Sequence, residues 1–535
     1  MNSNDNFTFI DNLVNRCVQQ SDKIVRDEAE ITLKNYANNH YSDFLIYFSD
    51  YISNETISVN KRIFITIFIK NLISSVYSEI QKTWTNDISQ DNKIIIKHNL
   101  FSALGTNIYS LGNSISGCIS AICKIEFPIQ NNFEILAKLI EVSQTSELQY
   151  KISALTTIKY IMEDVTFDVN PANELSGLLC LIYSSINSND YNIELKILCT
   201  SILELIIDYI DFVLKDSDNF EKLVNLVCGP LIDYSSIITN PKANTELNNK
   251  YVNNLLKCLC KFAQNYYMEI SFNIKNIFDI TSTIISYYNS KFDNVEICNE
   301  SFLDCVKICY NFWICLADKE KISIKYKIKS NNYLQTCETV LFQLVYDSIS
   351  KRTNDDEDDE YSHVYFFAVS LLELMTNCCT DTITSSIINI MNTLLNTKNI
   401  KDIKTSLMMY SSILSNKNSI YVIKIVDSSV YTIINYLKHQ DVTICRLSAI
   451  IIEKMLLNFY KHILDDNINN IIICCIDGLK SHSDNITKIY ISLALRNLLL
   501  NIKNEILQNC DNINNEANYI IKHDLRDSKV YYFNI

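Results

Sequence analysis

Glycine and proline are scarce in this chain: only 6 Gly and 4 Pro occur among 535 residues. A large β-sandwich, barrel or doubly wound sheet needs many tight turns, and those turns depend on these two residues. The chain is also longer than one compact core usually allows. Asn, Asp and Ser can cap and end helices in their place. The sequence therefore predicts helices joined by short polar turns, in several domains or in a repeat array.

An apolar stripe with the three- and four-residue spacing of a helix recurs along the chain. Examples are Ile152, Leu155, Ile158 and Ile161; Leu195, Leu198, Ile202 and Leu205; and Val252, Leu255, Leu259 and Phe262. Similar helices are predicted to begin near Glu296, Ser362, Asp402, Asp441 and Asp484. Successive starts lie roughly 40 to 60 residues apart, the interval of two-helix HEAT or armadillo units. We therefore expect an all-α fold, a HEAT-repeat α-solenoid wound into a superhelix.

The segment Asp441 to Phe459 is the clearest single unit. Asp441 is predicted to cap a helix, and Arg446 beside the apolar stripe is predicted to pair with an acidic residue of a neighbouring repeat. The expected buried face consists of Cys445, Ser448, Ala449, Ile452, Leu456 and Phe459.

Further helices are predicted toward the N-terminus. Their expected ranges are Asp22 to Asn38, capped by Ser21 or Asp22, Tyr41 to Ile52, Val59 to Tyr77, Lys93 to Leu111, and Gly117 to Ile125. Trp84 is expected in a connection. Pro128 is expected to begin the next helix, where its missing amide hydrogen costs least.

The chain is acidic, with 47 basic and 61 acidic residues and a net charge of -14. This balance argues against nucleic acid as a partner and favours basic proteins. Six carboxylates are consecutive and are followed by an aromatic residue: Asp355, Asp356, Glu357, Asp358, Asp359, Glu360 and then Tyr361. The run is predicted to attract a basic partner, and the alternative is an ordinary solvated loop.

Several classes of function lack a sequence signal. The 19 Cys form no CxxC pair, so reduced, buried thiols are expected. No phosphate-binding glycine loop, metal-ligand set or nucleophile elbow occurs, so we predict no catalytic site, no metal and no cofactor. The start at Met1 does not resemble a secretory signal, and stretches such as Ile63 to Ile69 are too short to span a membrane. A soluble cytoplasmic or nuclear protein without membrane insertion is expected.

A series of short motifs carries a family resemblance. It comprises Ile69-Lys70-Asn71, Trp84, Leu104-Gly105-Thr106, Cys118, Ile125-Glu126-Phe127-Pro128, Lys151 to Asp164, Tyr266-Tyr267-Met268-Glu269, Phe312-Trp313, the acidic run and Cys378-Cys379. None is specific alone, but their order and spacing resemble importin beta, of the karyopherin beta family. The resemblance covers about residues 10 to 460. The chain is divergent and shorter than usual for that family, as expected of a reduced receptor or of part of a longer protein.

The resemblance implies a HEAT superhelix that carries cargo through nuclear pores and releases it when Ran binds GTP. The implied partners are Ran in its GTP form, phenylalanine-glycine nucleoporins, and basic cargo or the adaptor importin alpha. The implied location is cytoplasm, nucleus and the pores of the nuclear envelope. In the family, Ran binds the second helices of the first repeats. These correspond here to Val59 to Val76, Gly117 to Ile125 and Gln149 to Met162.

The resemblance also implies a nucleoporin groove between the fifth and sixth repeats. Asn173-Glu174 sets the register, so Ser176, Gly177 and Cys180 stand where leucine, threonine and isoleucine are usual. Leu223 keeps an apolar residue across the groove, and Leu178 or Leu179 is expected to rebuild the apolar slot. For either leucine, core packing is the alternative. The predicted groove residues are Ser176, Leu179, Cys180 and Leu223.

The acidic run matches the loop of the eighth repeat that approaches importin alpha and contacts Ran in the family. Tyr361 and Ile451 stand at tryptophan positions, and Trp84 and Trp313 are the only tryptophans of the sequence. Six exposed charge pairs at ~0.2 to 1 kcal/mol each fall short of the roughly 12 kcal/mol of nanomolar binding. The run is therefore expected to steer basic ligands more than to hold an adaptor tightly.

Four regions follow from the resemblance. Residues 1–165 are assigned to Ran binding, 166–345 to central repeats with the nucleoporin groove, 346–510 to repeats with the acidic loop 354–361 on the cargo side, and 511–535 to a C-terminal tail. The alternative is a HEAT-repeat scaffold for a phosphatase, coat or chromatin complex without GTPase binding. That alternative explains the repeats and the acidity but not the order of the motifs.

Overall fold

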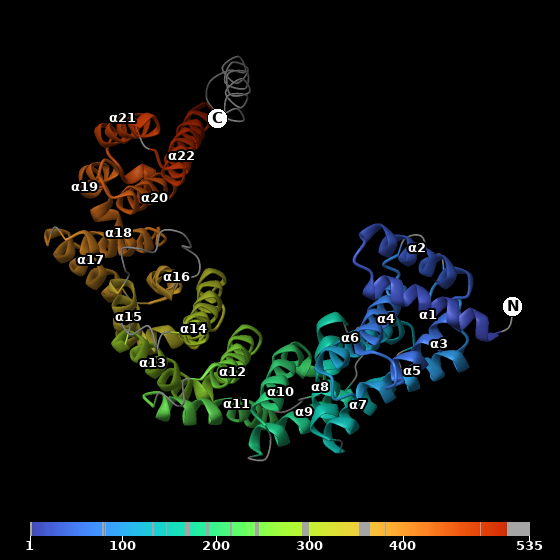
Figure 1. Cartoon of the computed structure of the whole chain (residues 1–535). Coiled ribbons are helices and arrows are strands. Elements are labelled where there is room, and N and C mark those ends of the chain that lie inside the picture. The colour runs from blue at the N-terminus through green and yellow to red at the C-terminus, as the bar shows by residue number, and fades with distance from the viewer. Residues whose placement is uncertain are drawn as a thin grey trace. The chain divides into compact units, whose positions relative to one another are not determined.

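The structure is a computed structural model of the whole chain (Figure 1). It describes residues 3–77, 80, 82–130, 133–145, 147–165, 172–188, 192–213, 217–240, 245–291, 299–351, 364–379, 381–397, 399–481 and 483–510. Within these ranges the chain forms α-helices α1 to α22, three short 3₁₀ helices and no strand. The all-α prediction is confirmed.

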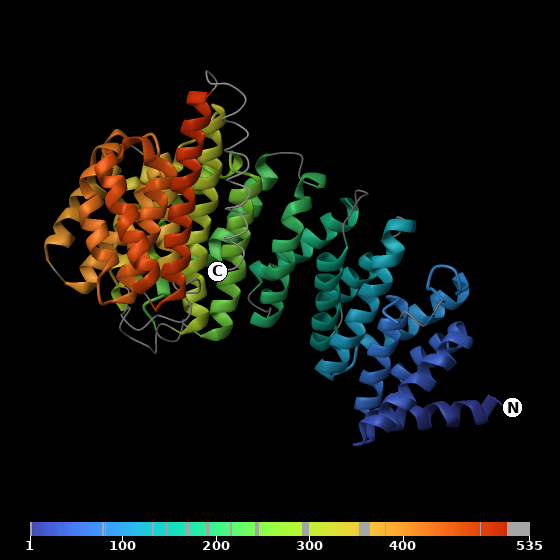
Figure 2. The same cartoon turned by 90° about the horizontal axis from the view of Figure 1, so that it is seen from above.

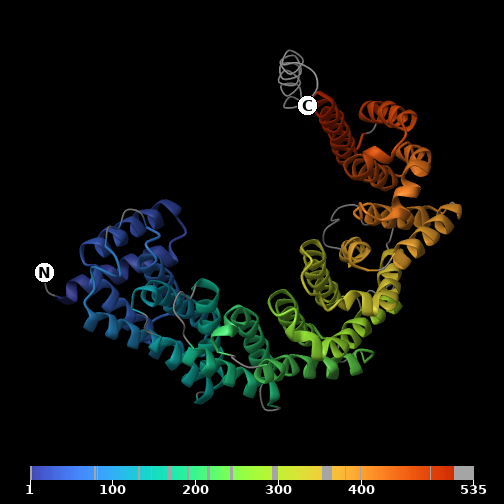
Figure 3. The ribbon, with the colours of Figure 1, turned by 180° about the vertical axis from the view of Figure 1, so that it is seen from behind.

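Two compact units divide the chain: Met1–Ile280 with Glu300–Cys305, and Thr281–Asn299 with Val306–Ile535. The first unit contains α1 (Ser3–Gln19), α2 (Lys23–Asn39), α3 (Tyr41–Ser53), α4 (Val59–Ile73), α5 (Gln90–Leu104), α6 (Tyr109–Gln130), α7 (Glu134–Thr145), α8 (Leu148–Asp164), α9 (Ala172–Asn187), α10 (Ile193–Ile206), α11 (Ser217–Ile237) and α12 (Glu246–Asn265). Each odd-numbered helix packs on the even-numbered helix that follows it. The even-numbered helices α4 to α12 also pack side by side in chain order, so the unit is a stack of helix pairs (Figure 3).

The second unit repeats this arrangement. It contains α15 (Tyr333–Ser350), α16 (Val364–Cys378), α17 (Asp381–Asn396), α18 (Ile400–Ile413), α19 (Ile420–Leu437), α20 (Val442–Phe459), α21 (Asp465–Ser481) and α22 (Asn485–Cys510). The helices α13 (Ile274–Lys291) and α14 (Glu300–Tyr326) each contain residues of both units. Within the second unit, α20 lies beside α22 (Figure 2).

The even-numbered helices begin at the intervals expected of two-helix repeats. From α8 onward the shortest interval is 36 residues, between Val364 and Ile400, and the longest is 64 residues, between Glu300 and Val364. The predicted starts near Asp402, Asp441 and Asp484 each lie within two residues of an observed helix start. The predicted starts at Glu296 and Ser362 lie outside the described residues.

Helix α20 forms as the sequence predicts. The Asp441 carboxylate accepts a hydrogen bond from the Ile444 amide at 3.1 Å, so it caps the helix. The predicted apolar face is buried along its whole length, from Cys445 to Phe459. Arg446 forms two hydrogen bonds with Asp484, from Nε at 3.0 Å and from Nη2 at 2.9 Å. The expected bridge to a neighbouring repeat is therefore confirmed, and its partner lies just before α22. The Asp22 cap of α2 is also observed.

The helix boundaries around residues 104 to 130 differ from the prediction. Pro128 does not begin a helix; it lies inside the last turn of α6. Proline has no amide hydrogen to donate to the carbonyl four residues earlier, and α6 ends two residues after it, at Gln130. Gly117 lies inside α6 as well, and the position of its absent Cβ is 3.6 Å from Lys70 Nζ. The glycine lets the Lys70 side chain of α4 lie close against α6.

Asparagine side chains link several repeats to the one before them. Asn254 of α12 donates to the Ile197 carbonyl of α10 at 3.0 Å. Asn458 of α20 donates to the Leu414 carbonyl after α18 at 2.8 Å. Asn501 of α22 donates to a carbonyl of α20 at 2.7 Å. Each of these side-chain amides donates a hydrogen bond to a backbone carbonyl of the neighbouring repeat. These bonds give the packed helices a defined register, and the apolar contacts between the helices add to it.

Helix α19 is a longer apolar segment than the stretches singled out in the sequence. Over its 18 residues the mean hydropathy is 1.2 and 33% of the window is buried, so by length and composition alone this described helix could cross a membrane. Lys424 and Asp427 interrupt its apolar run, which is why no long stretch stood out in the sequence. In the structure α19 packs on α20 and α21, and Asp427 accepts a hydrogen bond from the Leu464 amide at 2.8 Å.

Candidate functional site

The acidic run, Asp355 to Glu360, and Tyr361 lie outside the described residues. Along the chain they fall between Ser350, where α15 ends, and Val364, where α16 begins. These helices form the eighth consecutive pair, as the resemblance predicts. The role of the run remains a prediction.

The four residues predicted for the nucleoporin groove lie on two helices. Ser176, Leu179 and Cys180 belong to α9, and Leu223 belongs to α11, which packs on α9. Ser176 and Cys180 are exposed, Leu179 is partly exposed, and Leu223 is buried. Leu178, the other leucine considered, is fully buried and belongs to the core.

Leu179 is better placed for this groove than Ser176 or Cys180. The Cα of Gly177 faces α7, because the position of its absent Cβ is 4.0 Å from Ile140. At 100° per residue, Leu179 points about 200° around α9 from Gly177, away from α7 and toward the side of α11. Ser176 and Cys180 lie one turn apart on an exposed face between those two directions.

The helices predicted to bind Ran are neighbours in the first unit. Helices α4, α6 and α8 pack in that order, and a row of small and hydroxyl residues joins α6 to α8. Ser116 donates to the Ser153 carbonyl at 3.2 Å, and Thr157 donates to Ser116 Oγ at 2.9 Å. The absent Cβ of Gly112 would lie 2.9 Å from Ser153 Oγ. These contacts fix the spacing and register of α6 and α8.

Two of the motifs that carry the family resemblance contact each other. The Trp84 indole donates to Glu126 Oε1 at 3.0 Å, and both residues are buried. Lys97 Nζ lies 3.1 Å from Glu126 Oε2 and compensates the buried charge. Trp84 lies in the connection after α4, as predicted, and this contact anchors that connection to α6.

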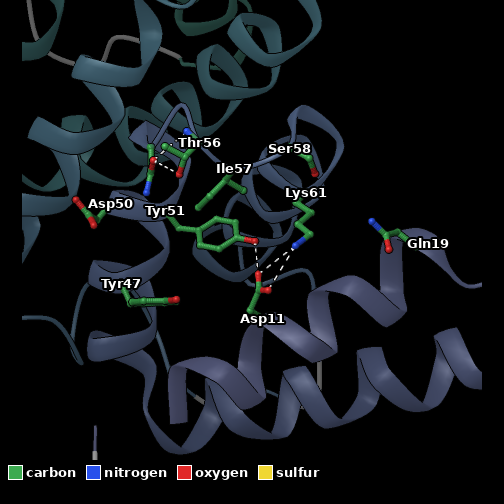
Figure 4. Close-up of a pocket in the computed structure, with 10 residues that line it drawn as sticks. Asp11, Gln19, Tyr47, Asp50, Tyr51, Thr56, Ile57, Ser58 and Lys61 are labelled. Atoms are coloured by element: carbon green, nitrogen blue, oxygen red, sulfur yellow. Dashed lines mark hydrogen bonds and ion pairs between the residues drawn. The ribbon is translucent and has the colours of Figure 1, made fainter. Parts of the chain in front are cut away.

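The sequence did not predict a polar pocket at the start of the first unit (Figure 4). The pocket has a volume of about 560 Å³ and lies between α1, α3 and the start of α4. Its lining residues are Asp11, Gln19, Tyr47, Asp50, Tyr51, Asn54, Thr56, Ile57, Ser58 and Lys61. A second cavity of about 670 Å³ shares Tyr47 and Asp50 with it.

The polar groups of this pocket bind one another. The Tyr51 hydroxyl donates to Asp11 at 2.7 Å, and Lys61 Nζ lies 3.4 Å from both Asp11 oxygens (Figure 4). Burial, together with the hydrogen bond to Asp11, raises the pKa of Tyr51. Tyr51 therefore stays neutral at physiological pH. The arrangement joins the first helix pair to the second and does not activate a nucleophile or base. The three residues lie 40 and 50 positions apart, so no local sequence signal identifies the cluster.

The cysteines in the described part of the chain are poorly placed to react. The described cysteines are free thiols, and most are buried. Burial raises the pKa of Cys118 to about 12, which disfavours the reactive thiolate. No group of three or more His, Cys, Asp or Glu among the described residues is placed to hold a metal ion.

Comparison with known proteins shows sequence similarity to importin subunits. Importin subunit beta-1 of Saccharomyces cerevisiae is 18% identical over 487 residues, covering 88% of this chain and 53% of that protein. Importin subunit beta-1 of Arabidopsis thaliana is 20% identical over 272 residues, covering 50% of this chain and 30% of that protein. This chain therefore spans about half the length of the yeast relative. Its match to the plant relative covers a smaller share of that protein. No family model matches the chain.

Solved structures show the same fold. Yeast importin-beta, Kap95p, has a TM-score of 0.75 at 18% identity, with 92% of this chain and 55% of that chain covered. Kap95 in its complex with Nup1 has a TM-score of 0.73 at 18% identity, with coverage of 92% and 56%. Kap121p bound to RanGTP has a TM-score of 0.59 at 13% identity, with coverage of 93% and 45%.

These likenesses establish the architecture of the chain as the HEAT-repeat α-solenoid of the karyopherins. They also confirm the resemblance predicted from the ordered motifs: this chain is similar in sequence and in fold to importin beta.

Proposed function

We propose that this protein is a nuclear transport receptor of the importin beta type. The single observation that carries the proposal is the similarity to yeast importin subunit beta-1, which extends over 88% of this chain. Such a receptor binds cargo, phenylalanine-glycine nucleoporins and GTP-bound Ran, and it is not an enzyme. It moves between cytoplasm and nucleus through the pores of the nuclear envelope.

Cargo release in this proposal is a competition. Cargo and GTP-bound Ran engage overlapping surfaces, so each lowers the affinity of the protein for the other by the same factor. The adjacent helices α4, α6 and α8 support the assignment of residues 1–165 to Ran. The solved complex of Kap121p with RanGTP supports Ran as the partner. The acidic run, Asp355 to Glu360, is assigned to basic cargo and to Ran, within the cargo-side region 346–510.

Nucleoporin binding is assigned to the surface between α9 and α11, within the central region 166–345. The Kap95 complex with Nup1 supports a nucleoporin as the class of partner. Leu179 supplies partly exposed apolar surface on α9, and Leu223 lies on the neighbouring helix α11. A shallow apolar slot suits weak, fast binding of phenylalanine side chains.

A pull-down on immobilised phenylalanine-glycine repeats tests this proposal against a HEAT-repeat scaffold. We expect retention on these repeats and no retention on matched repeats in which every phenylalanine is serine. The substitution Leu179→Asp should reduce retention. Ser184→Asp is the matched control, because Ser184 is exposed on α9 about 140° around the helix from Leu179. It adds the same charge to another face of α9 and should have a smaller effect. Equal retention on both kinds of repeat, or none on either, would favour the scaffold.

A further inference from the structure

The C-terminal end of α14 is a basic and apolar projection on an acidic protein. We call residues 319–329 the α14 tip. Its five lysines are Lys319, Lys321, Lys325, Lys327 and Lys329. No carboxylate of the described residues lies within ion-pair distance of any of them. The one acidic residue within the tip, Glu320, is buried and accepts a hydrogen bond from the Leu334 amide at 3.4 Å. The outward charge of the tip is therefore positive.

Apolar side chains alternate with these lysines and are open to solvent. Ile322 is 49% exposed, Ile324 51%, Tyr326 62% and Ile328 61%. At 100° per residue, Ile322 and Tyr326 share one side of the helix and Ile324 lies on the opposite side. Ser323, between these directions, is buried. The α14 tip therefore contacts the rest of the protein along the side that contains Ser323. Its exposed apolar side chains lie on both sides of that contact.

The way in which α14 ends leaves Ile328 exposed. Lys327 has a φ of 54°, and the Ile328 amide donates to the Ser323 carbonyl at 2.9 Å. This is the bond of a Schellman motif, in which the residue after the left-handed position usually packs an apolar side chain onto the last helical turn. The residues that would receive that contact are Ser323 and Ile322, yet Ile328 is 61% exposed and Ile322 is 49% exposed. The cap therefore leaves the isoleucine at position 328 largely open to solvent.

We propose that the α14 tip binds the surface of an anionic lipid bilayer. Lysine ammonium groups neutralise anionic headgroups, while isoleucine and tyrosine enter the boundary between headgroups and acyl chains. A bilayer deforms around a projecting helix end and covers side chains on both of its sides. A nucleic acid would neutralise the lysines but leave three isoleucines in water. A folded protein partner would need a groove that accepts both sides of the helix.

The inference does not depend on the transport proposal, because it rests on the exposed side chains of α14 alone. It concerns attachment to a membrane surface, and the tip is far too short to cross a bilayer.

Co-sedimentation of the full-length chain with lipid vesicles tests the proposal. We expect binding to phosphatidylcholine vesicles that contain about 30 mol% phosphatidylserine, weak binding to pure phosphatidylcholine, and loss of binding as salt is raised. The triple substitution Lys325→Gln, Lys327→Gln and Lys329→Gln should lower the affinity by about 100-fold, since each lysine near the surface contributes about five-fold. The control triple Lys401→Gln, Lys461→Gln and Lys480→Gln makes the same charge change at exposed positions elsewhere in the second unit, outside the apolar helix α19.

A second variant tests the apolar contribution. The pair Ile324→Ser and Ile328→Ser changes only exposed side chains, so its circular dichroism and thermal unfolding should match those of the unmodified chain. Its affinity for the anionic vesicles should fall by at least about tenfold. Equal losses in the lysine variant and its control would overturn the proposal, as would an unchanged affinity in the serine variant. Binding of a DNA duplex, without binding of vesicles, would also contradict it and would assign the tip to nucleic acid.

Discussion

At the residue scale, a small number of charged pairs join one repeat to another. Lys404 of α18 lies 2.8 Å from Asp441, which caps α20, and Lys454 of α20 lies 2.9 Å from Glu373 of α16, two repeats earlier. The Arg446 and Asp484 pair is bidentate and only 16% and 14% exposed, so solvent screens it less than the surface pairs. Hydrogen bonds from Arg446, and further bonds from Thr487, hold the pKa of Asp484 well below its usual range.

The substitution Asp484→Asn should lower the free energy of unfolding by about 2 kcal/mol at pH 7. Asparagine retains a side-chain oxygen for the Thr487 amide, so the change mainly removes the charge. Because the folded pKa of Asp484 is depressed, the pair stabilises the protein above the unfolded pKa of about 3.9 and loses this effect as pH falls toward the folded value. Urea unfolding of both forms should therefore give a difference that shrinks as the pH is lowered through and below pH 4.

The exposed Asp466 provides the control for that measurement. Asp466→Asn should change the free energy of unfolding by less than about 0.5 kcal/mol at any of these pH values. A difference for Asp484→Asn that stayed constant with pH would mean that the Arg446 pair contributes no charge-dependent stability.

At the scale of elements, repeat packing depends on where side chains are small. Gly112, Ser116 and Ser153 lie at the contact of α6 with α8, and their hydrogen bonds fix how the helices meet. Gly177 of α9 has no such constraint, since the position of its absent Cβ has only ordinary contact with Ile140. The two glycines therefore serve different purposes although both lie within helices.

The substitution Gly112→Ala should destabilise the first unit by about 1 to 2 kcal/mol, because the new methyl group would lie 2.9 Å from Ser153 Oγ and force a shift. Gly177→Ala is the matched control. It should be neutral or stabilising by up to about 1 kcal/mol, as is usual when alanine replaces a helical glycine with room for the methyl group. Hydrogen exchange of the α6 and α8 amides would locate the effect. If Gly112→Ala accelerated hydrogen exchange in neither α6 nor α8, the result would contradict the packing argument.

Local signals predicted the elements well. Asp441 was identified as a cap, and the buried face from Cys445 to Phe459 was identified by spacing, because both depend on residues within one helix. The prediction that Pro128 begins a helix was wrong. The sequence alone does not show whether a proline lies in the first turn of one helix or in the last turn of the helix before it. Arg446 was expected to find an acidic partner, but only the structure identifies Asp484, which lies 38 residues away.

The candidate sites were less predictable than the helices. Leu178 and Leu179 are adjacent in sequence, yet one is fully buried and the other partly exposed, which depends on the position of α7 and α11 around α9. The pocket at Asp11 requires two partners from later helices. The α14 tip combines charge visible in the sequence with exposure that only the structure provides.

At the scale of the whole molecule, charge is the property most relevant to partners. The net charge of -14 and the run Asp355 to Glu360 favour basic ligands through long-range attraction. Such attraction accelerates association more than it slows dissociation, so its signature is kinetic. The α14 tip is a local exception to this acidity.

Replacing the six carboxylates of that run with asparagine and glutamine should lower the association rate of a basic cargo peptide by about tenfold at low salt. The rate should also become less sensitive to salt, because screened attraction would contribute less to it. Stopped-flow association at several ionic strengths measures both effects. A rate at low salt equal to that of the unmodified chain would mean that the run is an ordinary solvated loop.

The affinity of the full-length chain for Ran tests the central claim most directly. Ran should be loaded with GDP or with a GTP analogue that is not hydrolysed, and its binding measured by titration calorimetry. A transport receptor of the importin beta type should bind the GTP form more tightly by at least about 100-fold, since release of cargo requires a coupling of this size. Equal affinity for the two forms, or binding to neither, would contradict the account.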